Sequence, residues 1–137
     1  MEKTELRFID YNYYAINLVK VNYSALNAAG NQPRVIIHDD YRIIDINSQN
    51  VKIELTRKVY FEPKGILEAE VVSEIKYNLK NEADRPEIEK EIYDNLFNLL
   101  TPLAARASLI IGVISHIHLN NPIINPPFPL MKESKPE

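Results

Sequence analysis

The most regular part of the sequence reads VKIELTRKVYF at residues 51–61 and ILEAEVVSEIKYNL at residues 66–79. In both stretches apolar side chains alternate with charged or polar ones, which is typical of β-strands that bury one face and expose the other. Only Arg57 interrupts the apolar series of the first stretch. Pro63 and Gly65 lie between the two stretches, as a tight turn prefers. We therefore predict an antiparallel hairpin over these residues.

The residues before this hairpin predict further strands. Residues 5–21 are long for one strand, and their apolar alternation slips around residues 10–12, where we expect a bulge or break. Asparagine, alanine, glycine and proline predict a loop over residues 22–34. Two short apolar strands follow, and we place them at residues 35–37 and 41–46, separated by a loop at residues 38–40.

After the hairpin the apolar spacing changes from two residues to three and four. This spacing predicts one continuous helix over residues 86–117. Asp84 is the expected N-cap residue, since its side chain can accept a hydrogen bond from the first helical turn. Pro102 lies inside the helix and predicts a bend near residues 98–101.

The second half of this helix is apolar on more than one side. A helix of this length extends about 48 Å, whereas a compact chain of this size has a diameter of about 37 Å, so one sheet cannot cover it. Small residues opposite the core-facing stripe would let a second helix approach closely. We therefore expect oligomerisation, the alternative being that the first two strands fold over this side. The predicted interface comprises Thr101, Ala105, Ser108, Leu109, Gly112, Val113 and Ser115.

The segment after the helix contains four prolines in eight residues, interleaved with isoleucine and phenylalanine. The prolines exclude a helix and a central strand, and the apolar residues argue against a free tail. We therefore expect residues 119–130 to form an extended strap on the surface of the fold. The whole chain, residues 1–137, is expected to be one domain with frayed ends at residues 1–5 and 131–137.

The composition excludes several classes of protein. The 137 residues suffice for one domain, and their net charge of −3 argues against nucleic-acid binding. The absence of cysteine removes disulfides, thiol nucleophiles and the common zinc sites. No signal peptide is visible, and the apolar run at residues 99–114 is short for a membrane span. We therefore expect a cytoplasmic protein without membrane insertion.

The sequence offers no constellation of catalytic or cofactor-binding residues. Its glycines are too dispersed for a phosphate-binding loop, and its serines lack the surroundings of a nucleophile. His116 and His118 point about 200° apart on a helix and cannot chelate one metal ion. We therefore expect no enzyme, no catalytic residue, no metal and no cofactor.

Two segments resemble the SecB protein-export chaperone family. Residues 100–107, LTPLAARA, are similar to the family's Leu-x-Pro-Tyr-Ala-Arg run inside its main helix. Residues 121–127, NPIINPP, are similar to the Phe-Pro-x-Leu-x-Leu-x-Pro segment that follows that helix. The order of strands, helix and strap also matches, so the resemblance covers most of residues 5–130. It implies an α+β fold, with a four-stranded antiparallel sheet covered on one face by a long helix, and a homotetramer built as a dimer of dimers.

The resemblance also implies a function, that of a holding chaperone. Such a protein binds unfolded or precursor polypeptides in apolar surface grooves and delivers them to the SecA motor of protein translocation. By this analogy the client-binding residues are Tyr11, Tyr13, Tyr14, Ile123, Ile124 and Phe128, and motor docking falls on Glu68, Glu70 and Glu74. The tyrosines can equally be ordinary aromatic residues of an edge strand, and the glutamates an ordinary solvated strand face.

The sequence departs from the family in two places. It has no counterpart of the family's second helix after residue 130, and Asn120 and Asn121 replace the glycine that follows the main helix. Both differences weaken the expectation of SecA coupling more than that of client holding. The alternative function is therefore an oligomeric SecB-fold interaction protein that is dedicated to one specific partner and has no export role.

Overall fold

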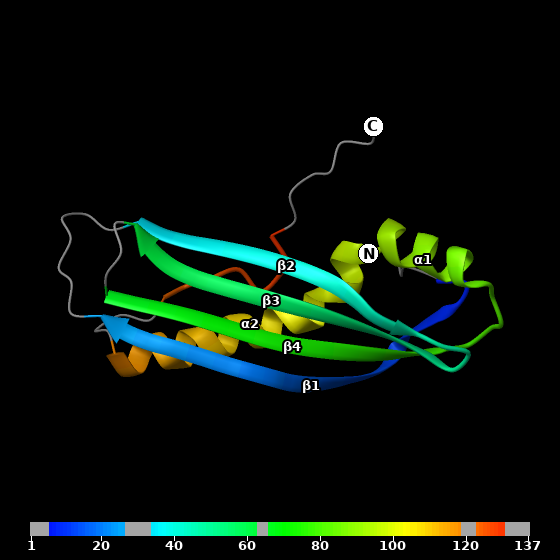
Figure 1. Cartoon of the computed structure of the whole chain (residues 1–137), viewed down its shortest axis with the longest axis horizontal. Coiled ribbons are helices and arrows are strands. Elements are labelled where there is room, and N and C mark those ends of the chain that lie inside the picture. Colours follow the sequence, from blue (N-terminus) through cyan, green and yellow to red (C-terminus); the bar gives the residue numbers. More distant parts are fainter. Residues whose placement is uncertain (1–5, 27–33, 63–65, 119–122, 131–137) are drawn as a thin grey trace.

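The computed structural model describes residues 6–26, 34–62, 66–118 and 123–130. Its elements are β1 (Ile9–Leu26), β2 (Arg34–Ile46), β3 (Asn50–Glu62), β4 (Ile66–Leu79), α1 (Arg85–Asp94) and α2 (Leu96–His118). The strands form one antiparallel sheet in the order β1-β4-β3-β2, and α2 runs along one face of it (Figure 1). This is the α+β architecture expected from the sequence, and β1 and β2 are the two edges of the sheet.

Several predictions concern residues outside the described ranges. They are the frayed ends at residues 1–5 and 131–137, the tight turn at residues 63–65, the middle of the predicted loop at residues 27–33, and the first part of the strap at residues 119–122.

The hairpin predicted from the alternation is confirmed. β3 and β4 are antiparallel neighbours, paired from Asn50 opposite Asn78 to Val59 opposite Ala69. The register between β1 and β4 shifts between Ile9 and Tyr14 and again after Leu18, so the irregularity expected near residues 10–12 is also present.

One predicted loop has wrong bounds, and another is a strand. Residues 22–26 continue β1, because the N-terminal part of β4 supplies a pairing partner for each of them. Residues 38–40 continue β2, so the two short strands predicted on either side of them are one strand. Asp39 fits the covered face of this strand because it lies directly opposite Arg57 of β3, which neutralises it.

The helical half contains two helices where one was predicted. α1 begins after Asp84, which is the N-cap residue as expected. The interruption falls at Asn95. At this position the backbone N–H donates to the Ile92 carbonyl, while the Asn95 side chain occupies the Glu91 carbonyl that a regular helix would use. The bend expected near residues 98–101 from Pro102 stays a prediction.

Pro102 lies inside α2 without ending it. Proline has no N–H, so it leaves the carbonyl four residues earlier, that of Asn98, without its helical partner. The hydroxyl of Tyr11 donates to this carbonyl at 3.1 Å. The hydroxyl of Tyr77 donates to the next carbonyl, that of Leu99, at 2.6 Å. Two tyrosines of the sheet therefore hold the helix at the place where the proline weakens it.

The core consists of two apolar clusters between the sheet and the helices. One lies under α1 and the first half of α2 and includes Ile53, Ile75, Tyr77, Ile92, Leu99 and Leu103. The other lies under the second half of α2 and includes Val59, Phe61, Leu67, Val71, Ala107, Ile111 and Ile123. Arg57 is fully buried on the same face of β3. It lies between Leu55 of the first cluster and Val59 of the second.

By length and composition α2 could cross a membrane, over Leu96–Ile117. The core helix of a soluble protein passes the same test, and 39% of the apolar window is buried inside the fold. The observation is therefore weak evidence for a membrane span.

Candidate functional site

The described part of the strap, residues 123–130, returns along α2 on the helix-covered face of the sheet (orange to red in Figure 1). Three hydrogen bonds join its first residues to the helix. The Ser115 hydroxyl accepts from the Ile123 N–H at 2.7 Å, and the Ser108 hydroxyl donates to the Asn125 carbonyl at 2.6 Å. The Asn125 side-chain amide donates back to the Ser108 carbonyl at 3.2 Å. These two serines of the predicted oligomer interface therefore contact the strap of their own chain.

The last residues of the strap are joined to the sheet through Arg57. Its Nε and Nη2 donate to the two carboxylate oxygens of Asp39, each at 2.8 Å. Its Nη1 donates to the Asn125 side-chain oxygen at 2.8 Å and also to the Pro126 carbonyl. Its Nη2 donates to the Phe128 carbonyl at 2.9 Å. All five N–H bonds of the guanidinium therefore have partners within the chain.

Asp39 completes this arrangement from β2. Its side chain is 1% exposed, and one carboxylate oxygen accepts the Leu130 N–H at 2.8 Å in addition to its bonds from Arg57. Buried charges are stable only when they are paired and hydrogen-bonded, and both charges here meet this condition. We call Arg57, Asp39 and Asn125 together the clamp.

A groove lies between the clamped end of the strap and the sheet edge formed by β2, which pairs only with β3 among the described residues. It encloses about 670 Å³ and is lined by residues 37–41 of β2, Phe97 of α2 and residues 128–130 of the strap. Phe97 and Phe128 pack against each other with ring centroids 6.1 Å apart, yet they remain 50% and 44% exposed. Burial raises the pKa of the Tyr41 phenol beside them, with a smaller contribution from Tyr93.

The edge strand and the exposed rings make this groove suitable for contact with an extended polypeptide. An unpaired sheet edge offers backbone N–H and C=O groups to an extended peptide, and neighbouring apolar hollows accept its side chains. Exposed aromatic side chains that are already packed together offer contact area at small cost in conformational entropy.

A second apolar surface lies on α2. Leu109, Val113 and Ile117 recur every fourth residue and are 69%, 55% and 69% exposed. We call these three side chains the aliphatic face. A helix normally buries such a stripe, so this face is the part of the described chain that most resembles an uncovered interface.

The structure does not bring the six predicted client-binding residues together. Within the strap, the side chain of Ile123 is buried in the core. That of Ile124 is 93% exposed, and Phe128 lines the groove. The three tyrosines belong to β1, at the opposite edge of the sheet. Tyr11 is half-buried and stacks on Tyr77, Tyr14 meets Tyr77 edge-on, and Tyr13 is exposed.

Sequence reasoning missed Phe97 and Tyr41 as groove residues. Phe97 is aromatic and lies off the core-facing helical stripe, which is the signal that could have identified it. Tyr41 could not be placed, because the strand that carries it was expected to begin there after a loop.

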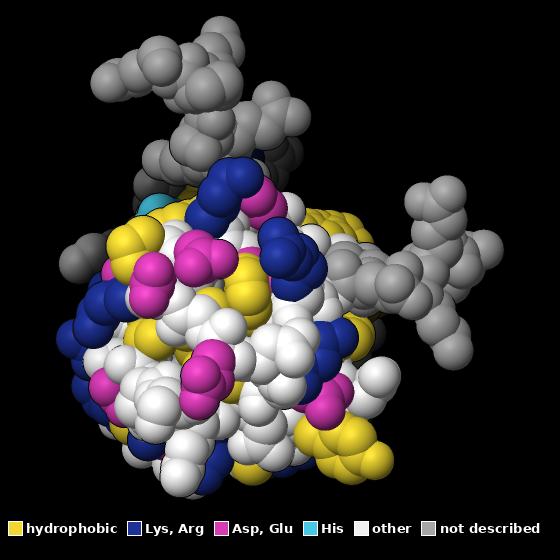
Figure 2. Space-filling view, turned by 90° about the vertical axis from the view of Figure 1, so that its right-hand side faces the viewer, with side chains coloured by type: hydrophobic (Ala, Val, Ile, Leu, Met, Phe, Trp, Pro, Cys, Tyr) yellow, Lys and Arg dark blue, Asp and Glu magenta, His cyan; other side chains and the backbone are white. Residues whose placement is uncertain are grey.

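The glutamates predicted to dock a motor protein lie on the outer face of the sheet among lysines. Glu70 lies 3.2 Å from Lys20 and 3.7 Å from Lys58, and Glu74 lies 3.9 Å from Lys52. The end of the molecule next to α1 likewise mixes both signs of charge (Figure 2). The role assigned to Glu68, Glu70 and Glu74 stays a prediction.

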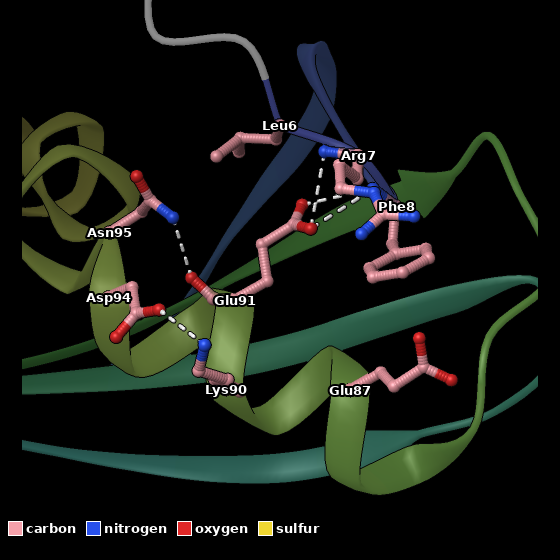
Figure 3. A pocket seen from close by; sticks show the side chains of 8 residues that line it. All are labelled: Leu6, Arg7, Phe8, Glu87, Lys90, Glu91, Asp94 and Asn95. Atoms are coloured by element: carbon pink, nitrogen blue, oxygen red, sulfur yellow. Dashed lines mark hydrogen bonds and ion pairs between the residues drawn. The ribbon is translucent and has the colours of Figure 1, made fainter.

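A hollow of about 420 Å³ lies between α1 and the chain that enters β1 (Figure 3). The Glu91 carboxylate lies beside it and accepts the backbone N–H groups of Arg7, Phe8 and Ile9 at 3.0–3.2 Å. The charge of this carboxylate is therefore used to fix the start of β1 to α1, and we interpret this hollow as structural.

Comparison with known proteins bears on the fold. No family model matches the sequence, and no curated protein matches it in sequence. Among solved structures, the chain is similar to the Mycobacterium tuberculosis SecB-like chaperone Rv1957 in complex with a ChAD peptide from the HigA1 antitoxin. The TM-score is 0.66 at 9% identity, covering 94% of this chain and 91% of that one. A protein of unknown function from Streptococcus agalactiae matches with a TM-score of 0.45 at 12% identity, covering 80% of this chain and 93% of that one.

Proposed function

We propose that this chain, which has a SecB-like fold, is a holding chaperone that binds unfolded or precursor polypeptides. The observation that carries the proposal is the groove, where exposed Phe97 and Phe128 lie beside the free edge strand β2. An extended client adds its backbone to this edge and packs apolar side chains against the exposed surface of the two rings. Ile124 enlarges the contact surface of the strap, and the exposed Tyr13 and Tyr14 of β1 offer a second contact area.

The comparison with Rv1957 supports polypeptide binding by this fold, since that SecB-like chaperone was solved with an antitoxin peptide. Delivery to SecA requires a docking face, and the proposed one carries Glu70 and Glu74 already paired with lysines. A chaperone dedicated to one partner, with no export role, is therefore the alternative version of the same function.

We also propose that the protein acts in the cytoplasm as a homo-oligomer. The aliphatic face supports this, because leaving three large apolar side chains in water forgoes about 1.5–3 kcal/mol each. A second copy covers Leu109 and Val113, with the small residues Ala105 and Gly112 allowing close approach. The resemblance to the SecB family implies a dimer of dimers, with the second contact through an edge strand.

The experiment that tests the groove is a titration with a permanently unfolded polypeptide, reduced and carboxymethylated so that it cannot refold. In the double variant Phe97→Ser/Phe128→Ser we expect affinity to fall by about tenfold or more, as for other aromatic anchors. Tyr23→Ser is the matched control, since Tyr23 is an aromatic side chain 50% exposed on β1. Equal affinity of wild type and double variant would contradict the proposal.

A further inference from the structure

Arg57 is an anomaly in the sheet that the proposed function does not yet explain. It occupies a position at which the alternation of β3 calls for an apolar side chain, and it is 0% exposed. Its partner Asp39 occupies the matching position on β2. Two charges have thus been placed on the buried face of neighbouring strands, where each must be removed from water.

Stability alone does not account for such a pair. Replacing a buried ion pair by apolar residues of similar volume is often neutral or stabilising, because the desolvation of the two charges offsets their attraction. What a buried pair does provide is fixed geometry, since a planar guanidinium and a carboxylate hold their partners in defined directions.

The partners of the pair are on the strap, and most of them are backbone atoms. Arg57 donates to the carbonyls of Pro126 and Phe128, and Asp39 accepts the N–H of Leu130. Proline-rich segments have few N–H groups with which to pair, so two of the three backbone groups that this strap offers to the pair are carbonyls. Because the clamp holds the backbone at residues 128 and 130, the side chain of Phe128 is left free to line the groove.

We infer that the clamp is the positioning device of the groove: Arg57, Asp39 and Asn125 hold the strap where residues 128–130 form one wall of the client site. The inference rests on the proposed function and names the residues that set the geometry of its site. The serine contacts hold the start of the strap, residues 123–125, against α2, and only Asn125 takes part in both sets of contacts. Loss of the clamp therefore releases the groove wall and leaves the beginning of the strap attached.

The test is the double variant Arg57→Met/Asp39→Leu, which removes both charges and keeps similar volumes. Single variants are unsuitable because each leaves an uncompensated buried charge. The matched control is Arg42→Met/Glu54→Leu, which removes a pair between the same two strands, at directly opposed positions on the outer face. Both proteins are compared with wild type by hydrogen exchange at the Leu130 amide and by titration with the reduced, carboxymethylated polypeptide.

For the clamp variant we expect at least about tenfold faster exchange at Leu130, since this amide loses its acceptor, and at least about tenfold weaker client binding. The melting temperature and native mass should remain near those of wild type, and the control should change neither exchange nor affinity. Unchanged exchange, or faster exchange with unchanged affinity, would overturn the inference. Failure of wild type to bind the polypeptide would instead contradict the proposed function, while the exchange measurement still reports on the clamp.

Discussion

The groove beside β2 and the aliphatic face of α2 are both apolar and exposed, but they are built differently. The groove is aromatic, borders the edge strand β2, and has one wall fixed by charges buried beneath the strap. The aliphatic face consists of three branched side chains on α2, and no described part of the strap covers them.

This difference separates two kinds of contact. Permanent interfaces between copies are more apolar and resemble a protein core cut in half, which suits the aliphatic face. A surface that takes changing extended chains gains from rings that pack in many ways and from backbone groups that pair with any sequence. This difference supports our proposal that the aliphatic face contacts other copies of the chain and that the groove contacts clients.

The largest expected effect concerns the buried Arg57–Asp39 pair beneath the groove wall, which has no counterpart under the aliphatic face among the described residues. Asp39→Ala leaves the guanidinium of Arg57 buried without its carboxylate, and we expect a loss of about 3–5 kcal/mol in the free energy of unfolding. Glu54→Ala breaks the exposed pair with Arg42 between the same strands and should cost about 1 kcal/mol or less. Urea denaturation of both variants measures the contrast. Equal losses would show that the buried pair is no different from a surface one.

The next effect concerns the aliphatic face. Leu109→Glu/Val113→Glu places two charges in the proposed interface between copies, and we expect the native mass to fall to that of a smaller assembly. Ile124→Glu, on the strap, is the control and should leave the mass unchanged. Light scattering after size exclusion measures the mass of both variants. A double variant with the mass of wild type would contradict the assignment of the aliphatic face as the interface between copies.

A smaller effect concerns the phenol of Tyr77, on which Tyr11 and Tyr14 pack near the β1 edge. Burial raises the pKa of Tyr77, with lesser contributions from Tyr11 and Tyr14, so the folded state keeps this phenol protonated. The unfolded chain ionises tyrosine near pH 10, so the contribution of Tyr77 to stability is complete below about pH 10 and is lost as pH rises above it.

The variant Tyr77→Phe tests this dependence. At neutral pH it should lose about 1 kcal/mol, because the Leu99 carbonyl loses its donor. Above about pH 10 its unfolding free energy should fall less steeply than that of wild type. Parallel pH profiles measured by urea denaturation would contradict the assignment.

The smallest effect concerns Ser73, which is buried on the covered face of β4. Its hydroxyl has no hydrogen-bond partner among the described residues. Removing an unsatisfied buried hydroxyl should be neutral or stabilising. We therefore expect Ser73→Ala to leave the free energy of unfolding unchanged or to raise it by up to about 1 kcal/mol. A clear loss of stability in thermal melts would mean that the hydroxyl has a partner after all.

The elements that repeat regularly were predictable from the sequence, and those that depend on distant partners were not. The β3–β4 hairpin follows from alternation alone, and the helical half follows from its spacing, although the interruption at Asn95 does not. Asp39 looked like part of a loop because its partner Arg57 lies 18 residues away, although each interrupts an apolar series. These two interruptions, taken together, were the available signal for a cross-strand pair.

The same limit applies to the candidate site. Phe128 was assigned to client contact through the resemblance of its proline-rich segment to the SecB family. It lines the groove, and its contact with clients stays a prediction. Ile123, from the same segment and equally apolar, is buried because the Ser115 hydroxyl draws its backbone onto α2. Which of two similar residues faces outward depends on hydrogen bonds that composition does not reveal.

The most direct test of the account is the native mass of the protein with and without a slowly folding precursor added in its unfolded state. We predict an oligomer whose mass increases by that of one bound client, and no increase when the same precursor is folded beforehand. An oligomer whose mass is indifferent to the unfolded precursor would contradict a general holding function and leave the dedicated-partner version.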